Sequence, residues 1–347
     1  MSTDTYRQWV LAAHPQGLPK PADFRLKDGP MPVPAAGEFL VRIVLIGLEP
    51  RLRLMLNPTT EANKAMRPDG GAAGLGRLVP SSAIGEVLRS NDPAFAPGDL
   101  VEGWFGWQTH AVTTARGLSD RHNPAGIVRV DPALGPLSAH LSILGIPGLT
   151  AWIALDHKPV AAGETLVVTS AAGTVGAIAA QLGKLAGARV VGLTGSDEKC
   201  RYLADELGLD AAINYRTAGD LAAALRAACP NGVDHHFDNV GGPMAETIAA
   251  QFNAGARHTI CGVVSQYNVD QGKWHQSNAF AGYFNIHAHV DEYDAARAAL
   301  SKLLRAGKIK CVERVFDGLD RAPAAFAGLM AGDNIGKWLV RVGPDPA

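Results

Sequence analysis

The residues of this sequence that point most directly to chemistry are the small ones at positions 171–176, Ala-Ala-Gly-Thr-Val-Gly. A β-branched, apolar segment, 164–170, comes before them. A helical pattern of small and apolar residues follows at 177–186, and a second apolar strand at 188–193. This strand–turn–helix–strand context is what a dinucleotide-binding turn requires before its glycines count as evidence.

Within that turn, Gly173 and Gly176 stand where the second and third glycines of G-x-G-x-x-G would stand, and Ala171 occupies the first position. Small residues let the backbone approach a pyrophosphate, which binds at the positive end of the following helix. That helix is predicted to begin near Thr174. The pattern therefore predicts a dinucleotide cofactor.

The end of the second strand indicates which dinucleotide is bound. An NAD enzyme usually carries Asp or Glu there to bind the ribose hydroxyls, but this sequence has Ser196. Asp197 and Glu198 open the next helix, where carboxylates complement the helix dipole. Lys199 follows one turn on, and it is interpreted either as a contact for a 2′-phosphate or as a solvated helix lysine.

Other polar residues follow predicted strands and have structural alternatives. Tyr215 could contact a phosphate or simply cap the third strand, and Asn239 could bind a ligand at a strand end or serve as a turn residue. His235 and His236 lie inside the fourth strand and are interpreted as packing residues. Cys261 is interpreted as a small buried hydrophobe.

The sequence gives no sign of a metal site, and no bound metal is expected. No cysteine precedes Cys200, and the four cysteines of the chain form no C-x-x-C pair. Without thiolate ligands at zinc spacing, polarisation of a carbonyl by zinc is not expected. Hydride transfer to an already electrophilic carbon is favoured instead. The histidines before Cys200 are scattered, at His14, His110, His122, His140 and His157.

Two kinds of element pattern divide the chain. Apolar residues alternate in 37–47, and further short strands are predicted at 84–88 and 98–101, with a turn-rich surface loop at 57–76 between them. From about residue 137, strands alternate with helices, which predicts a doubly wound parallel sheet. Its strands are expected near 165–170, 188–194, 211–215, 233–238 and 257–262. A final helix near 322–330 precedes a strand at 337–342, whose alternation matches the N-terminal β-rich part.

Composition limits the class of protein. The 347 residues are enough for two domains, and 32 basic residues nearly balance 33 acidic ones, so no nucleic-acid or membrane surface is expected. The uncharged stretch between Glu164 and Lys184 is interrupted by Ser, Thr and Gly, and is interpreted as a buried strand and helix rather than a membrane span. The first seven residues lack the basic-then-apolar pattern of a secretory signal, so a cytoplasmic enzyme with free thiols is expected.

The motifs together resemble one family, the zinc-independent medium-chain reductases. This group includes prostaglandin reductase/leukotriene B4 dehydrogenase, plant double-bond reductases and bacterial curcumin reductases, which are NADP-dependent. The resemblance covers nearly the whole chain. The matching segments, in order, are 144–152, 171–176, 195–199, 214–217, 237–242 (Phe-Asp-Asn-Val-Gly-Gly), 261–268 (Cys-Gly-Val-Val-Ser-Gln-Tyr-Asn) and 332–337.

This resemblance implies a fold, a cofactor and an assembly. The fold is a GroES-like, β-rich catalytic domain (1–137 and 309–347) joined to a Rossmann domain (138–308), with the active site in the cleft and a homodimer as the expected assembly. Lys199 and Tyr215 resemble the pair that holds the NADPH 2′-phosphate. The cofactor-binding residues it implies are Thr150, Gly173, Thr174, Val175, Gly176, Gly195, Ser196, Lys199, Tyr215, Asn239, Cys261, Gly262, Ser265, Tyr267, Tyr283, Phe284, Asn285 and Asn334.

The expected reaction is NADPH-dependent reduction of the C=C bond of an α,β-unsaturated ketone or aldehyde. Conjugation makes the β-carbon electrophilic, so hydride can attack it without a metal, and donors near the carbonyl oxygen stabilise the developing charge. Tyr267, after the fifth strand, is the candidate donor, and the resemblance implies the nicotinamide ribose hydroxyl as another. A quinone oxidoreductase, and a regulator that binds NADP without catalysis, are the alternative functions.

One segment departs from the family pattern. Family members usually have Asp-Pro-Tyr-Met-Arg in the first β-unit, whereas this chain has Glu-Pro-Arg-Leu-Arg at 49–53. Arg51 therefore replaces the usual active-site tyrosine. It is interpreted either as an exposed loop arginine or as a catalytic-site residue that holds an anionic group of the substrate, because guanidinium binds carboxylates bidentately.

Overall fold

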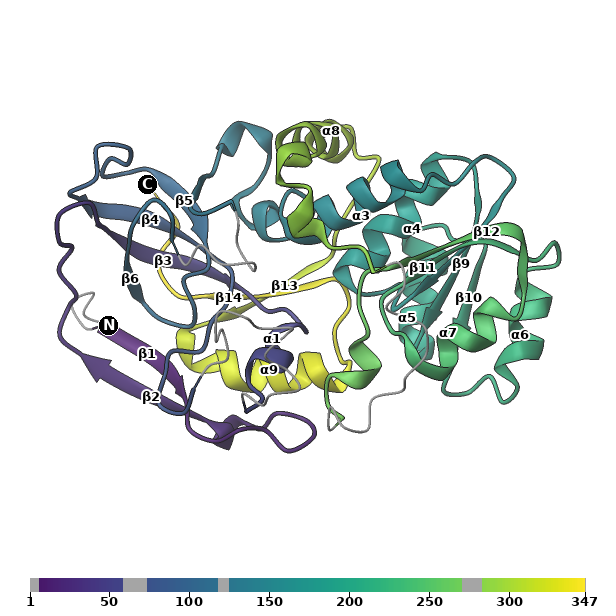
Figure 1. The fold of residues 1–347 in the computed structure, drawn as a ribbon, viewed down its shortest axis with the longest axis horizontal. Helices are drawn as coiled ribbons and strands as arrows, with labels where there is room; N and C mark the ends of the chain where they lie inside the picture. Colours follow the sequence, from purple (N-terminus) through teal and green to yellow (C-terminus); the bar gives the residue numbers. More distant parts are fainter. Residues whose placement is uncertain (1–5, 59–73, 118–124, 270–282, 347) are drawn as a thin grey trace. The chain divides into compact units, whose positions relative to one another are not determined.

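The computed structural model of the chain describes residues 6–58, 74–117, 125–269 and 283–346. Within these ranges the chain forms two compact units (Figure 1). Unit 1 contains the chain up to Leu141, Glu313–Asp333 and the chain from Trp338 onward, and unit 2 contains Ser142–Val312 and Asn334–Lys337. The boundaries expected from the sequence, at 137/138 and 308/309, stay a prediction of where the catalytic and cofactor-binding domains divide.

Unit 1 is built on a mixed arrangement of strands. A two-stranded antiparallel sheet joins β1 (Tyr6–Leu11) and β2 (Phe24–Gly29). A seven-stranded sheet has the order β13-β14-β3-β4-β5-β7, and β6 pairs with β3. Its strands are β3 (Phe39–Gly47), β4 (Ala83–Ser90), β5 (Leu100–Gly103), β6 (His110–Thr113), β7 (Val128–Arg129), β13 (Glu313–Asp317) and β14 (Lys337–Arg341). Helices α1 (Leu52–Met55) and α9 (Ala322–Ala331) belong to the same unit.

Strand β3 is the centre of the larger sheet, since β14, β4 and β6 all pair with it. The sequence predicts a strand there from the alternation of apolar residues in 37–47, and β3 occupies most of that range. Every residue of β3 except Arg42 is buried. Val44 and Ile46, on the face opposite Ile43 and Leu45, have no accessible surface. Both faces of this strand are therefore covered.

Unit 2 is a doubly wound parallel sheet, which confirms the predicted fold class. Its strands are β8 (Thr165–Thr169), β9 (Arg189–Thr194), β10 (Ala211–Asn214), β11 (Val233–Asp238) and β12 (Phe252–Ile260), all paired in parallel. Helix α3 packs against α4 and α8, and α6 packs against α7, so helices cover both faces of the sheet. The helices are α3 (Ile146–His157), α4 (Thr174–Leu185), α5 (Asp197–Arg201), α6 (Leu221–Ala228), α7 (Gly242–Ala249) and α8 (Tyr293–Arg305).

The strand order of unit 2 is β10-β9-β8-β11-β12. Counted along the chain, the strands lie in the order three, two, one, four, five, and the order reverses between β8 and β11. Open α/β sheets bind ligands beyond the carboxyl ends of the strands at such a switch point. The residues that follow β8, β9, β11 and β12 therefore define the place to look for a site.

The strand bounds mostly match those predicted from the sequence. The main difference is β12, which begins at Phe252, five residues before the predicted start. Strands β1, β2, β6, β7 and β13 were not predicted. Most of the predicted surface loop at 57–76 lies outside the described residues.

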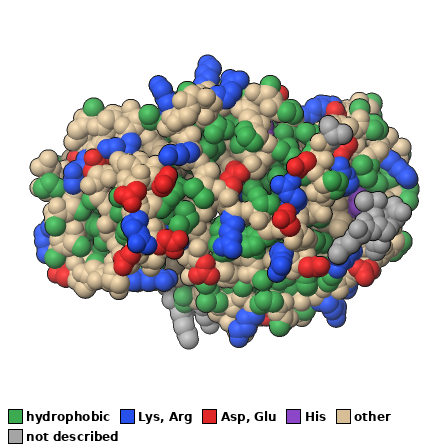
Figure 2. All heavy atoms as spheres, turned by 180° about the vertical axis from the view of Figure 1, so that it is seen from behind, with side chains coloured by type: hydrophobic (Ala, Val, Ile, Leu, Met, Phe, Trp, Pro, Cys, Tyr) green, Lys and Arg blue, Asp and Glu red, His purple; other side chains and the backbone are tan. Residues whose placement is uncertain are grey.

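The described surface carries both signs of charge. On the face shown in Figure 2, Lys and Arg side chains are interspersed with Asp and Glu. None of the helices in the described ranges combines the length and the apolar character that a membrane crossing needs.

Candidate cofactor and active site

The turn after β8 is tight, and its backbone leaves no room for larger side chains. Ser170 adopts a left-handed backbone conformation (φ 51°), and its carbonyl accepts a hydrogen bond from the Gly173 N–H (2.9 Å). A Cβ atom on Gly176 would lie 2.4 Å from the Ser170 carbonyl oxygen. Only glycine fits at that position, which brings the start of α4 close to β8.

Helix α4 presents an open N-terminus at this turn. It begins at Thr174 and runs for twelve residues; its N-cap, Gly173, supplies no side-chain cap, and its first turn has no acidic residue. Unpaired N–H groups and the helix dipole at such an end attract an anion. Gly173, Thr174, Val175 and Gly176 therefore fit the pyrophosphate of a dinucleotide.

A second segment far along the chain lies against the same turn. The N–H of Gly336 donates to the Ala172 carbonyl (2.8 Å), and the Thr174 hydroxyl donates to the Gly336 carbonyl (3.1 Å). The Asn334 side-chain amide also donates to the Gly336 carbonyl (3.1 Å). Asn334, predicted as a cofactor residue, is thus near the turn after β8.

Two features lie at the end of β9: Ser196 caps the next helix, and the Tyr215 phenol lies against Gly195. Ser196 caps α5, since its hydroxyl accepts a hydrogen bond from the Lys199 N–H (3.3 Å). The N–H of Tyr215 donates to the Thr194 carbonyl (3.0 Å). A Cβ on Gly195 would lie 2.9 Å from the Tyr215 hydroxyl oxygen. Gly195, Ser196, Lys199 and Tyr215 are therefore neighbours.

Arg216 is a member of this group that the sequence reasoning missed. Its Nε would lie 3.2 Å from a Cβ on Gly195, and its guanidinium carbon lies 5.9 Å from the centre of the Tyr215 ring. The signal in the sequence was a cation directly after Tyr215. Asp197 accepts a hydrogen bond from the Asn214 amide (2.7 Å), so this carboxylate is already used. A phenol and a guanidinium beside Gly195 fit a phosphate rather than a ribose diol.

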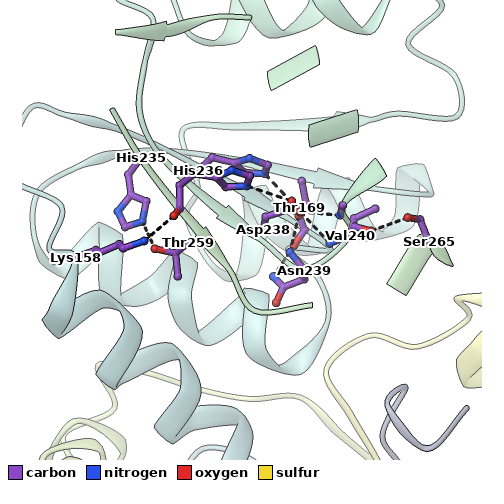
Figure 3. A network of polar contacts seen from close by, with 11 residues as sticks. Lys158, Thr169, His235, His236, Asp238, Asn239, Val240, Thr259 and Ser265 are labelled. Atoms are coloured by element: carbon purple, nitrogen blue, oxygen red, sulfur yellow. Dashed lines mark hydrogen bonds and ion pairs between the residues drawn. The ribbon is translucent and has the colours of Figure 1, made fainter. Parts of the chain in front are cut away.

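A buried carboxylate organises the switch point between β8 and β11 (Figure 3). Asp238 is fully buried, and its Oδ1 accepts hydrogen bonds from the Thr169 hydroxyl (2.8 Å) and from the N–H groups of Val240 (2.9 Å) and Gly241 (3.0 Å). The Thr169 hydroxyl in turn accepts from the Asn239 N–H (2.9 Å). The Asn239 side-chain amide donates to the Thr169 carbonyl (2.8 Å). Asn239 is therefore fixed by both its backbone and its side chain.

Histidines surround the other side of this carboxylate. His258 Nε2 lies 3.3 Å from Asp238 Oδ2, and the His236 ring stacks on the His258 ring with centroids 4.7 Å apart. Burial by itself raises the pKa of Asp238, but the His258 hydrogen bond, the charge of His236 and the backbone N–H groups outweigh it and hold that pKa well below the usual range. Burial lowers the pKa of His236 to about 4 and that of His235 to about 3. Both histidines are buried packing residues, as interpreted from the sequence.

The segment after β12 runs beside the turn after β11. The N–H groups of Cys261 and Gly262 donate to the Asp238 carbonyl (2.7 and 3.2 Å). The Ser265 hydroxyl donates to the Val240 carbonyl (2.6 Å), as Figure 3 shows. As a residue Cys261 is partly exposed, so the expectation of a buried small hydrophobe holds only for its thiol, whose pKa is raised by burial and by the charge of Asp238.

Tyr267 folds back over this segment. It is buried, and its hydroxyl oxygen would lie 3.5 Å from a Cβ on Gly262, while the Asn239 carbonyl oxygen would lie 3.3 Å from the same point. Asn239, Gly262 and Tyr267 therefore meet at the carboxyl ends of β11 and β12. This gives the candidate site a phenol next to the turn that is hydrogen-bonded to Asp238 and Thr169.

Residues 283–285 continue along the edge of β12. Tyr283 pairs with Ile260, and the Phe284 N–H donates to the Ile260 carbonyl (2.7 Å). The Asn285 side chain accepts a hydrogen bond from the His287 N–H (3.2 Å) and so caps a short 3₁₀ turn. These three residues lie at the same sheet edge as the segment after β12.

Two predicted residues are not part of this group in unit 2. Thr150 is buried in α3, and its hydroxyl donates to the Ile146 carbonyl (2.7 Å) within that helix. Arg51 belongs to unit 1. It is half-buried rather than an exposed loop residue: its Nε donates to a Glu49 carboxylate oxygen (2.9 Å), and its guanidinium lies 4.5 Å from the centre of the Trp104 ring.

The fold and the site define a medium-chain dehydrogenase/reductase with a dinucleotide-binding domain. The family model described as the N-terminal domain of oxidoreductase matches residues 7–120, and the one described as zinc-binding dehydrogenase matches residues 174–291. The chain belongs to this family, and within it to the group that contains prostaglandin reductase 1 and NADPH-dependent curcumin reductase.

The relatives match along the full length. Prostaglandin reductase 1 of Mus musculus is 34% identical, covering 96% of this chain and 98% of its own. NADPH-dependent curcumin reductase of Escherichia coli is 33% identical, covering 98% and 97%. The crystal structure of CurA from Vibrio vulnificus in complex with NADPH matches with a TM-score of 0.85 at 32% identity, covering 97% of this chain and 99% of that one.

Proposed function

We propose that this protein is an NADPH-dependent reductase that reduces the C=C bond of α,β-unsaturated ketones or aldehydes. The observation that carries the proposal is the fixed turn at the switch point, where Asn239 and the Tyr267 hydroxyl lie together beside Gly262. The named activities of the full-length relatives support the same reaction. The chain is an NADP-dependent oxidoreductase, and its substrate is a small molecule.

Two groups of residues would bind two parts of the dinucleotide, its pyrophosphate and its 2′-phosphate. The open N-terminus of α4 would hold the pyrophosphate, because its N–H groups are uncapped by side chains and the turn before it has no bulk. Lys199, Tyr215 and Arg216 would hold the 2′-phosphate, because Tyr215 and Arg216 lie against Gly195 and Lys199 is in the first turn of the helix that follows β9. When bound, the dinucleotide supplies a hydride from its nicotinamide ring.

The remaining residues act on the substrate and on its surroundings. The Tyr267 phenol would donate a hydrogen bond to the carbonyl oxygen of the substrate, where negative charge develops as the β-carbon is reduced. The Cys261 thiol stays protonated near neutral pH, because its pKa is raised by burial. It is therefore a poor nucleophile toward an enone, which would otherwise alkylate it.

Arg51 is proposed as a positioning group for an anionic part of the substrate. Its Nε is paired with Glu49, and its guanidinium stacks on Trp104, so its plane is already oriented. We also propose a homodimer in the cytoplasm. The four cysteines of the structure are all free thiols, which is typical of a reducing compartment.

The test is a labelling experiment on the purified protein. A conjugated ketone is reduced with NADPH that carries deuterium at the transferred position of C4, and the product is read by NMR. Label on the β-carbon with the carbonyl intact supports the proposal; label on the carbinol carbon overturns it. A quinone panel run beside the enones tests the quinone alternative. No NADPH consumption with any acceptor would indicate a regulator instead.

A chelator arm of the same assay tests the expected absence of a catalytic metal. After exhaustive treatment with a strong chelator, we expect enone reduction at an unchanged rate, because no cysteine ligand precedes Cys200. Activity that disappears and returns on addition of zinc would contradict the metal-free mechanism.

A further inference from the structure

Two histidines and a glutamate that the proposed reaction does not use meet in unit 2. His157 is the last residue of α3, Glu292 is the N-cap of α8, and His289 lies beside both of them. His157 Nε2 is 2.9 and 3.0 Å from the two Glu292 carboxylate oxygens, and His289 Nδ1 is 2.9 Å from one of them. His157 and Glu292 are 135 positions apart in the chain, yet with His289 they bring three polar side chains together.

The ring geometry allows both imidazoles to share one ligand. The His157 and His289 rings are nearly perpendicular (88°), with centroids 4.6 Å apart. Their in-plane lone pairs can therefore converge on a point beside the carboxylate. The Phe284 ring stacks on His289 at 5.0 Å and 10°, which holds that imidazole in place. The three side chains are 40%, 24% and 32% exposed, so an ion from solvent can reach them.

The separations fit a transition-metal ion. Zinc sites have metal–nitrogen and metal–oxygen distances of about 2.0–2.2 Å, so tetrahedral neighbours lie roughly 3.3 Å apart. The observed nitrogen–oxygen distances of 2.9–3.0 Å need only a small adjustment to reach that spacing. Two histidines and one glutamate are also a donor set that zinc uses, with the fourth position left to water.

A second cluster of similar composition lacks this geometry. His236 and His258 stack with ring planes only 8° apart, so their in-plane lone pairs run side by side and do not converge. Asp238 Oδ1 already accepts three hydrogen bonds. We therefore assign no metal to that cluster, although its three ligand atoms also lie close together.

We propose that His157 Nε2, His289 Nδ1 and the Glu292 carboxylate bind a divalent transition-metal ion of the zinc class. The ion replaces the imidazole N–H protons that otherwise face the carboxylate. Occupancy joins the end of α3 to the start of α8 and to the segment that follows Phe284, whose N–H is bonded to the end of β12. The site stabilises unit 2 and takes no part in hydride transfer.

The test titrates tag-free, chelator-stripped protein with Zn²⁺ against a chromophoric chelator. The three ligand variants are His157→Ala, His289→Gln and Glu292→Gln. Each should lose at least about ten-fold in Zn²⁺ affinity, the lower end of the loss seen when a metal's supporting groups are removed. His287→Ala is the matched control, because it removes a neighbouring histidine outside the trio and should bind Zn²⁺ like the parent.

Two further readouts distinguish this site from others. Cu²⁺ used as a spectroscopic probe should show coupling to two imidazole nitrogens in the parent protein and to one in His157→Ala. Zn²⁺ should raise the melting temperature of the parent and leave that of His157→Ala unchanged. Parent-like affinity in all three ligand variants overturns the proposal. A loss of affinity in His258→Gln overturns it as well, because the ion would then belong to the Asp238 cluster.

Discussion

At the scale of single residues, the choice of cofactor depends on what covers Gly195. A Cβ there would collide with the Tyr215 hydroxyl at 2.9 Å and crowd Arg216 at 3.2 Å. The nearby acid, Asp197, is bonded to Asn214. The end of β9 thus offers cationic and phenolic donors in the place where an NAD enzyme carries a carboxylate.

We predict that Lys199→Ala weakens NADPH binding by on the order of 1.5–3 kcal/mol, the value of a hydrogen bond to a charged group. NADH binding should hardly change, because NADH lacks the 2′-phosphate. Fluorescence titration with both cofactors measures the difference. Lys184→Ala is the matched control, since Lys184 is paired with Asp210 and should leave both affinities intact. Equal losses for the two cofactors in Lys199→Ala would show that this lysine does not read the phosphate.

Tyr267 carries the second prediction at this scale. Its hydroxyl lies near Gly262 and the Asn239 carbonyl, and removing one donor to a developing oxyanion costs roughly 10–1000-fold in rate. Tyr267→Phe should therefore lower kcat by that range and leave the affinity for NADPH unchanged, because the ring still packs. Steady-state kinetics with cofactor titration separate the two. A parent-like kcat would assign the phenol to packing only.

At the scale of elements, β8 and β11 are joined at their ends by one side-chain network. The Thr169 hydroxyl donates to Asp238 and accepts from the Asn239 N–H, so a single atom links the two strands to the turn. Gly241 is needed in that turn, since its φ is +67° and a Cβ would lie 2.8 Å from a Val263 methyl carbon. Buried, fully satisfied networks of this kind rigidify a site.

We predict that Thr169→Val destabilises this turn by about 1–3 kcal/mol, because the Asn239 N–H is left without its partner and Asp238 Oδ1 loses one of its three hydrogen bonds. The Michaelis constant for NADPH should rise more than kcat falls, because Asn239 loses the hydrogen bond that holds its backbone and keeps only the one made by its side chain. Thr169→Ser retains the hydroxyl and should rescue the affinity. Urea unfolding and steady-state kinetics provide the two measurements. If Thr169→Ser behaves like Thr169→Val, the methyl group matters and the hydrogen bonds do not.

At the scale of the whole molecule, buried histidines make folding depend on pH. Neither ring nitrogen of His236 has a hydrogen-bond partner among the described residues, and burial lowers its pKa to about 4. The ordinary value in an unfolded chain is about 6.5. Between these two pKa values, the His236 ring is protonated in the unfolded state but not in the folded state, so lowering the pH favours unfolding.

We predict that the free energy of unfolding falls as pH drops from 7 toward 4, by up to about 1.4 kcal/mol per pH unit for each such histidine. His235, with its pKa lowered to about 3, acts in the same direction. Denaturant unfolding at several pH values gives the slope. His236→Phe keeps an aromatic ring without a titrating group, so its slope should be shallower. If the slope of unfolding free energy against pH is unchanged in this variant, His236 does not cause the pH dependence.

The sequence by itself determined the alternating half of the fold and the nature of the cofactor turn. Strands buried on both faces appear as continuous apolar runs, and a helix start beside a strand demands small residues such as Gly176. Ser196, Lys199 and Tyr215 could be read from their positions after predicted strands. These signals are local, because each depends on a few neighbouring residues.

What only the tertiary structure decided is which side chains meet. Thr169 and Asp238 are 69 residues apart, and their contact depends on β8 lying next to β11. Arg216 against Gly195, Tyr267 against Gly262 and the His157–Glu292 contact likewise depend on strand order and helix packing. A sequence pattern shows which residues are polar or apolar. Whether two distant side chains meet depends on the distance between them, which only the fold determines.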